Sequence, residues 1–303
     1  MFSIRRVDSR VAEATEQLGT KPKFWFRDGE RRFLFKAEVR GTGEDWAEVV
    51  SCCLCKLLGL PHVEYELAEE YDEEKTLGPG VICENMAPPP TSLILGNQLL
   101  MERDPGYPTQ QRFKVRQHTV QAVVEVISKL DPPSREWMSG VPMPVQTALD
   151  VFVGYVLLDA WIANQDRHHE NWAAIRDDKL RLAPTYDHGA ALARNLEDKE
   201  RQERLATKDA NRTVSAFVKR GRSAFYNEGE SKPMGLEEAF RKFADSAPAA
   251  STAWLERLRA ISPGDVMTIL SEVPIHRMSG PTKAFTFELL LANQNRLTRE
   301  QTA

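Results

Sequence analysis

The sequence predicts an α+β protein with two unequal lobes, the first small and strand-rich and the second larger and mainly helical. Residues 1–86 contain several short stretches rich in aromatic and β-branched side chains, whereas helical patterns prevail in residues 87–303. Between them lies "APPPTS", residues 87–92, whose three consecutive prolines are typical of a stiff connector. We therefore expect the boundary between the two lobes at this connector.

Two local signals mark the main elements of the first lobe. The stretch "FWFRDGERRFLFK", 24–36, has two aromatic-rich halves around Asp28-Gly29, which predicts a β-hairpin. Residues 41–60 carry apolar side chains at helical spacing and end at Gly59, a typical C-cap. This pattern predicts the one main helix of the lobe.

Further elements follow from alternation and from helical periodicity. Residues 62–69 are expected to form a strand because their apolar residues alternate. Residues 78–86 are expected to form a turn followed by another strand. An amphipathic helix is predicted over 119–130. Residues 145–164 are apolar on nearly all sides, which predicts a central buried helix. Residues 188–233 show no clear period, and the remainder of the chain is expected to be helical with breaks at prolines.

Composition and charge exclude several classes of protein. The 303 residues are 42% hydrophobic and 28% charged, which is typical of a globular chain with a sizeable core. The formal net charge of −4 argues against direct binding of nucleic acid. The N-terminal residues lack the apolar core of a signal peptide, and Asp150 and Asp159 interrupt the longest apolar stretch. We expect a cytoplasmic protein without a membrane segment.

Three of the four cysteines lie close together in the predicted helix 41–60. They are Cys52, Cys53 and Cys55, and the fourth is Cys83. Adjacent residues of a helix point in different directions, and a zinc site requires more convergent ligands. We expect reduced cysteines packed on a helix.

The stretch "ANQDRHHENW", residues 163–172, has the densest group of polar side chains in the chain, and it directly follows the predicted buried helix. Asp166 lies in this stretch, and Asn171 lies five positions later, where a short hairpin is expected to begin. Asp187 follows the end of that hairpin, so the hairpin can return it to the neighbourhood of Asn171. Oxygen ligands of this kind suit magnesium bound together with phosphates.

This spacing resembles a known catalytic arrangement. Protein kinases have D-x-x-x-x-N, followed after a hairpin by D-F-G. Here the chain reads D-R-H-H-E-N and then Asp187-His188-Gly189. The stretches "NQDRHHENW" and "LAPTYDHG" resemble the HipA-like serine/threonine kinases, and weaker similarity extends across most of the chain. The resemblance implies a two-lobed fold related to protein kinases and phosphoinositide kinases, and transfer of phosphate from ATP with Mg²⁺ as cofactor.

The resemblance implies a role for each residue at a matching position. Asp166 matches the catalytic base that orients and deprotonates the substrate hydroxyl. Asn171 and Asp187 match the two magnesium ligands. Lys36 matches the lysine that holds the ATP phosphates, and Glu48 matches the acid that positions this lysine.

Further positions are assigned less directly. Glu84 to Met86 correspond to the hinge, where backbone groups contact adenine. Glu44 is an alternative to Glu48, because acids are common on helix faces. His168 matches a histidine that we interpret as ordering the loop rather than moving protons.

The phosphate loop is expected at "LGTKPK", residues 18–23, although the chain has no G-x-G-x-x-G motif. Gly19 allows close approach of the backbone, and Lys21 or Lys23 adds positive charge. Members of the family are often controlled by phosphorylation in this loop, so Thr20 is a candidate for autophosphorylation.

The substrate and the partner follow only from the resemblance. It implies a protein substrate and a role as the toxin of a toxin–antitoxin pair, with a small helix-turn-helix antitoxin as partner; a stand-alone kinase is the alternative. Small-molecule acceptors also remain open. The basic stretch 212–226 follows the metal-binding aspartate and is either a solvated loop or a segment that docks substrate.

Two other functions compete with an active kinase. One is a metal-dependent hydrolase built on Asp166, His168, His169 and Asp187, which requires both imidazoles to converge on one ion. Adjacent histidines seldom point the same way, and we expect His169 to be exposed. The other is a pseudokinase that binds nucleotide without turnover.

Overall fold

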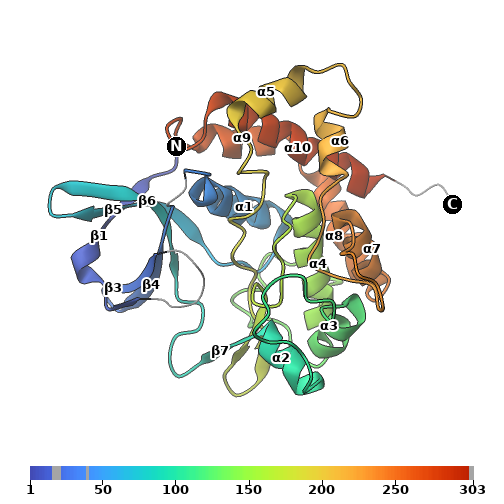
Figure 1. The fold of residues 1–303 in the computed structure, drawn as a ribbon. Coiled ribbons are helices and arrows are strands. Elements are labelled where there is room, and N and C mark those ends of the chain that lie inside the picture. The colour runs from blue at the N-terminus through green and yellow to red at the C-terminus, as the bar shows by residue number, and fades with distance from the viewer. Residues whose placement is uncertain (16–21, 39–40, 300–303) are drawn as a thin grey trace.

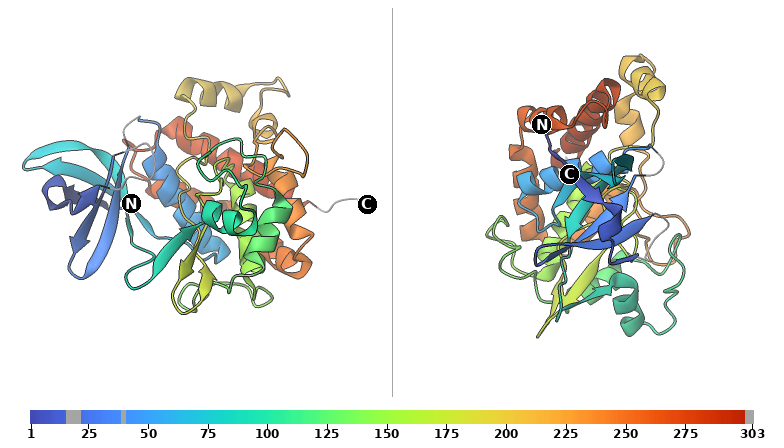
Figure 2. Two further views of the ribbon diagram at one scale, coloured as in Figure 1. Left: turned by 60° about the horizontal axis from the view of Figure 1, so that its bottom comes forward. Right: turned by 90° about the vertical axis from the view of Figure 1, so that its left-hand side faces the viewer.

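The computed structural model describes residues 1–15, 22–38 and 41–299. The N-terminal part is a curled β-sheet, and the C-terminal part is a group of helices with a second, smaller sheet (Figure 1). Helix α1 (Glu44–Leu58) lies between them. In the left view of Figure 2, the large sheet is on one side of α1 and the C-terminal helices are on the other.

The strands of the large sheet run in the order β1-β5-β6-β4-β3-β2 among the described residues. Strand β1 pairs in parallel with β5, and the other neighbours are antiparallel. Gly29 forms the turn of the β3–β4 hairpin with a φ of +60°, which a glycine adopts without strain. The predicted hairpin is therefore confirmed. The strands are β1 (Ile4–Asp8), β2 (Ala14–Thr15), β3 (Lys23–Asp28), β4 (Arg31–Ala37), β5 (Tyr65–Asp72) and β6 (Lys75–Glu84).

The alternation of side chains along β4 separates a packing face from a functional face. Phe33 and Phe35 enter a buried aromatic cluster, in which Phe24 stacks on Phe35 with 5.0 Å between ring centroids. Leu34 and Lys36 point to the opposite face, because neighbouring residues of a strand alternate. The aromatic layer thus holds Lys36 on the face that is turned toward α1.

Helix α1 packs on both sides. Its residues Val49 and Cys52 join a cluster with the sheet, while Val50 and Leu54 belong to the large core of the C-terminal helices. Twelve of its fifteen residues are buried. The helix therefore connects the two parts through packing as well as through the chain.

The second part is built around α4, which contacts α3, α7, α8 and α10. Almost every side chain of α4 is buried, as its uniformly apolar sequence predicts. The helices are α2 (Gly96–Arg103), α3 (Val120–Ile127), α4 (Ala148–Trp161), α5 (Asp198–Ala206), α6 (Val214–Val218), α7 (Leu236–Ala244), α8 (Pro248–Ala260), α9 (Pro263–Glu272) and α10 (Gly280–Thr298), beside a 3-10 turn at Ser9–Val11.

A small sheet of β7 (Ser92–Leu95), β8 (Ala173–Arg176) and β9 (Leu180–Leu182) adjoins the helices. Strands β8 and β9 form the hairpin predicted between Asn171 and Asp187. The large sheet ends at Glu84 and β7 belongs to the small sheet, so the chain changes sheets across the proline-rich connector.

Some elements were not predicted from the sequence. Helices α5 and α6 lie within 188–233, where no period was found. The reason is visible in α5, which buries only the side chain of Arg201 and therefore has no apolar stripe. Strand β1 buries only Val7, so its sequence shows no alternation. Across the part of the chain that the structure describes, no helix is long and apolar enough to cross a membrane.

Gly59 ends α1 with a φ of +77°, and a Cβ at this position would collide with the carbonyl oxygen of Gly140. We expect Gly59→Ala to lower the free energy of unfolding by about 3 kcal/mol or more, since backbone strain adds to the collision. The matched control is Gly29→Ala, which has the same sign of φ but open space around its Cβ. It should cost only about 1–2 kcal/mol. Urea denaturation measures both, and equal losses would contradict the packing argument.

Candidate active site

Three side chains from distant segments meet at the centre of the molecule. Lys36 Nζ donates to Asp187 Oδ1 at 2.8 Å and to Glu48 Oε1 at 3.1 Å. Tyr65 Oη accepts from Lys36 Nζ and from the backbone N–H of Asp187, at 3.3 Å in each case. The sheet, α1 and the segment after β9 thus each supply one charged group. Glu48, rather than Glu44, contacts the lysine, because Glu44 pairs with Arg194.

The charges of this cluster stabilise one another. Burial disfavours the charged form of Lys36, but Asp187 and Glu48 together hold its pKa well above the ordinary value. Burial likewise opposes the ionised form of Asp187, yet Lys36 and then Lys23 outweigh burial and lower its pKa. For Glu48, which is 3% exposed, burial is the stronger effect and raises the pKa. Asp187 therefore stays a carboxylate, the form in which it could bind a metal ion.

The backbone around Asp187 is strained in a way that serves this geometry. Asp187 has a φ of +60°, which is uncommon for a residue with a side chain. The next backbone N–H, that of His188, donates to Glu48 Oε2 at 2.7 Å. Glu48 therefore binds Lys36 with one oxygen and the Asp187 segment with the other.

The loop over residues 163–172 begins where α4 ends and carries Asp166 and Asn171. Asn171 Nδ2 donates to the backbone oxygen of Asp166 at 2.6 Å, and the backbone N–H of Asp166 donates to Asn164 Oδ1 at 3.2 Å. This orientation makes the amide oxygen of Asn171 the atom that a metal would use. The Asp166 side chain is 32% exposed, so its carboxylate is accessible from solvent.

A buried ion pair connects the 163–172 loop to α4. Arg167 Nε and Nη2 donate to the two carboxylate oxygens of Asp159 at 2.8 Å each, and both side chains are almost fully buried. Arg167 Nη1 also donates to the backbone oxygen of Asn171 at 2.8 Å. Neither residue was identified from the sequence as part of the site. The available signal was Asp159, a charged residue inside a helix that is otherwise almost entirely apolar.

The two adjacent histidines are buried and point to different neighbours. His168 Nε2 accepts from Arg112 Nε at 3.0 Å, and burial, together with Arg112, lowers the pKa of His168 to about 3. The expectation that His169 is exposed is wrong: it is 1% exposed, and its Nδ1 lies 2.8 Å from Tyr107 Oη. The loop between α2 and α3, which contains Tyr107, covers His169.

The geometry does not support the set of ligands required for a hydrolase. Among the described residues, one group of at least three potential metal-ligating side chains converges, and it contains neither His168 nor His169. His168 Nε2 instead faces Arg112 Nε, and His169 Nδ1 faces Tyr107 Oη. The two imidazoles therefore do not face one ion.

Two cavities meet at the charged cluster. One, of about 460 Å³, lies beside the end of β6; its apolar part is lined by residues such as Leu34, Val63 and Met86, and charged residues including Glu84 line the rest. The other, of about 400 Å³, is lined mainly by charged residues, including Glu48 and Asp166. The cavities share four lining residues, which are Lys23, Lys36, Arg112 and Asp187. Gly19, Thr20 and Lys21 lie outside the described residues.

Arg112 is a site residue that sequence reasoning missed. It extends from the loop before α3, lines both cavities and lies 3.4 Å from Glu170 Oε2. No motif marks it, because its place depends on how that loop folds over the 163–172 loop. A third cavity, of about 330 Å³, also borders Arg112 and reaches Asp166.

The basic stretch 212–226 borders this third cavity. Ser223 and Tyr226 line it, and the backbone N–H of Arg222 donates to Gln165 Oε1 at 3.2 Å. Arg212 instead forms a surface ion pair with Glu203 at 2.9 Å. One end of the stretch thus lies beside Asp166, and the other is solvated.

Comparisons with known proteins identify the fold. Neither a protein-family model nor a curated protein matches the chain by sequence. A proinflammatory kinase from Helicobacter pylori, CtkA, superposes with a TM-score of 0.71 at 17% identity, over 94% of this chain and 92% of that one. A structure of the toxin–antitoxin system HipA, HipB and its operator DNA from Shewanella oneidensis MR-1 gives a TM-score of 0.53 at 13% identity. There the match covers 94% of this chain and 65% of the other. The chain therefore has the fold of a HipA-like kinase, as its two sequence motifs predict.

Proposed function

We propose that this protein is a HipA-like kinase that transfers the γ-phosphate of ATP to a serine or threonine hydroxyl of a protein. The observation that carries the proposal is the meeting of Lys36, Glu48 and Asp187 at the junction of an apolar and a charged cavity. Phosphoryl transfer needs a positioned nucleotide and compensation of negative charge more than covalent chemistry, and this junction can supply both.

The nucleotide would occupy both cavities. The apolar cavity suits the adenine base, which backbone groups between Glu84 and Met86 would contact. The phosphates would then extend toward Lys36 and Lys23, whose positive charges lie at the junction. Gly19, Thr20 and Lys21 remain the proposed phosphate loop, and Thr20 remains the proposed site of autophosphorylation.

Asn171 and Asp187 would hold Mg²⁺, and their chemistry fits it. An amide oxygen and a carboxylate kept ionised are hard oxygen ligands of the type that magnesium prefers. The ion supplies charge neutralisation to the phosphates. Because Asp187 Oδ1 already contacts Lys36, this carboxylate can orient the lysine toward the same phosphates.

Asp166 is proposed as the base. Its carboxylate is exposed at the wall shared by the charged cavity and the third cavity, so an acceptor hydroxyl in the third cavity can reach it. As the oxygen of the hydroxyl attacks phosphorus, Asp166 accepts the hydroxyl proton. The third cavity opens between the loop of Arg112 and the stretch 212–226, which favours a peptide segment as the acceptor.

A role as the toxin of a toxin–antitoxin pair belongs to the same proposal. Its support is the fold shared with the HipA of the HipA–HipB–operator complex. A small helix-turn-helix protein would then be the partner, and this chain itself would make no direct contact with nucleic acid.

The first test is transfer of label from γ-labelled ATP with Mg²⁺ to the protein itself or to lysate proteins. Asp166→Asn should reduce the rate about 10²–10⁴-fold because the base is lost. Asp187→Asn should reduce it at least about a hundredfold because a metal ligand is lost. The control is Asp178→Asn at the exposed tip of the β8–β9 hairpin, which should retain full activity.

The outcome also separates the competing functions. Binding of ATP, seen as a rise in Tm, without any transfer to protein or small-molecule acceptors would indicate a pseudokinase. Transfer that persists in Asp166→Asn and Asp187→Asn would refute the assignment of both residues. Transfer to metabolites but not to proteins would replace the protein substrate by a small-molecule acceptor.

Arg112 should contribute to phosphate binding, because its guanidinium borders both cavities at their junction. We expect Arg112→Ala to lower kcat/KM for ATP about tenfold or more, as expected for a lost charge-assisted contact. Arg116→Ala is the matched control, since Arg116 is exposed on the same loop but lines neither cavity. Equal kinetics for the Arg112→Ala variant and the unmodified protein would exclude this role.

A further inference from the structure

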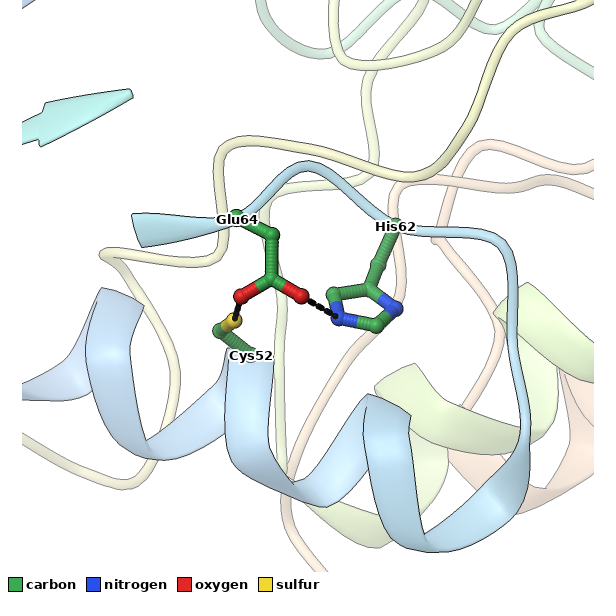
Figure 3. A group of neighbouring side chains, drawn as sticks. All are labelled: Cys52, His62 and Glu64. Atoms are coloured by element: carbon green, nitrogen blue, oxygen red, sulfur yellow. Dashed lines mark hydrogen bonds and ion pairs between the residues drawn. The ribbon is translucent and has the colours of Figure 1, made fainter. Parts of the chain in front are cut away.

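A second group of side chains brings three potential metal-ligating atoms together outside the proposed nucleotide site (Figure 3). The group consists of Cys52, His62 and Glu64. These atoms, one from each residue, all lie within 4.8 Å of one another. Cys52 belongs to α1, while His62 and Glu64 follow the turn after that helix. The sequence offered no convergent ligands for the cysteines within the helix, because the other two ligands come from the chain beyond Gly59.

The ligand atoms lie close to the separations found around a small tetrahedral ion. Cys52 Sγ lies 3.5 Å from Glu64 Oε2, and His62 Nε2 lies 3.4 Å from Glu64 Oε1. Ligands bonded to zinc at 2.0–2.3 Å in a tetrahedron are about 3.3–3.8 Å apart. The carboxylate faces both other ligands, one with each oxygen, so a small rotation places one oxygen in the shared coordination sphere.

The imidazole of His62 is already oriented for coordination. Its Nδ1 lies 2.6 Å from the backbone oxygen of Leu60, a distance at which Nδ1–H donates. This bond orients the ring so that Nε2 points toward Cys52 and Glu64. Burial disfavours the charged ring, but Cys52 and Glu64 outweigh burial and raise the pKa of His62 to about 9. Nε2 is buried and forms an ion pair with Glu64 Oε1 at 3.4 Å, which a metal ion would replace. A backbone carbonyl on the outer nitrogen is the common arrangement for a histidine that binds a metal.

The remaining groups leave one side of the cluster open to solvent, from which an ion could enter. Lys56 pairs with Glu64 Oε2, so Oε1 is the oxygen that can turn to a metal without breaking this ion pair. Glu64 is 57% exposed, which opens the cluster to solvent on one side, whereas Cys52 is buried. A fourth position would be filled by water, which is typical of a three-ligand zinc site.

From this geometry we propose that Cys52, His62 and Glu64 form a binding site for a zinc-class transition-metal ion. The thiolate and imidazole select zinc or cobalt over magnesium, which prefers oxygen ligands. The site is distinct from the proposed magnesium site at Asn171 and Asp187. Binding replaces the thiol proton of Cys52 and the proton on Nε2 of His62, and both protons leave to solvent as the sulfur–metal and nitrogen–metal bonds form.

An ion at this site would fasten three segments that position the nucleotide site. Cys52 lies one helical turn beyond Glu48, and Glu64 directly precedes Tyr65. His62 forms a bridge with Thr185, two residues before Asp187. The metal would therefore connect the middle of α1, which carries Glu48, to the chain that leads into Tyr65 and lies beside the segment of Asp187.

The test is a titration of the metal-free purified protein with Co²⁺ in the absence of Mg²⁺, followed by absorbance. We expect one equivalent to give the intense near-ultraviolet band of a cobalt–thiolate bond, and Zn²⁺ to abolish it by displacement. The band should be lost in Cys52→Ser and kept in Cys53→Ser, whose sulfur lies on the neighbouring helix position outside the cluster. It should also persist in Asp187→Asn, which shows that the magnesium site is not its source.

A second variant keeps the test decisive if Cys52→Ser does not fold. Glu64→Gln changes a largely exposed side chain, so its circular dichroism should match that of the unmodified protein. Its affinity for Co²⁺ should fall at least about tenfold. The proposal is overturned if the unmodified protein shows no thiolate band, if Cys52→Ser retains the band, or if Glu64→Gln binds Co²⁺ equally well.

Discussion

The buried ion pair between Arg167 and Asp159 is the interaction on which the geometry of the 163–172 loop depends. It joins the end of α4 to the residue that follows Asp166, and the same guanidinium holds the backbone of Asn171. A guanidinium and a carboxylate shielded from water are expensive to separate, because either one alone would remain as an uncompensated charge. The loop therefore has one favourable arrangement, although most of its own side chains are polar.

The same pair extends to the segment of Asp187. Arg167 Nη2 lies 3.2 Å from His188 Nε2, and that nitrogen lies 2.9 Å from Thr185 Oγ1. Burial, together with the nearby Arg167, holds the pKa of His188 well below its usual value, so His188 is a neutral ring. A neutral ring can accept a hydrogen bond from the arginine. The proposed base and both proposed magnesium ligands are thus positioned from one buried centre.

The local parts of the candidate site could be inferred from the sequence more directly than its long-range parts. Asp166, Asn171 and Asp187 lie within one short stretch, where the spacing of a loop and a hairpin is enough to imply that they are neighbours. Lys36 was identified only through the resemblance, since it is 151 residues away from Asp187 and no local pattern joins them. The two-lobed fold itself was predicted from composition and motifs, and the shared fold with CtkA confirms it.

What escaped prediction was decided by tertiary packing. Arg112 belongs to a loop without periodicity, and its position depends on contacts with His168 and Glu170. Cys52 can meet His62 and Glu64 only if the chain reverses direction after α1. Gly59 indicates a turn at that point, but it does not determine the direction in which the chain continues. His169 was expected to be exposed because it is polar, whereas the loop that contains Tyr107 covers it.

The double packing of α1 also limits how this helix can change during evolution. Of its fifteen residues, only Lys56 is exposed, and successive side chains face two different hydrophobic clusters. A substitution that suits the sheet must leave the contacts with the C-terminal helices intact, and the reverse is also required. Related proteins should therefore vary little in the volume of each side chain along α1, while the polar surface of α5 is free to diverge.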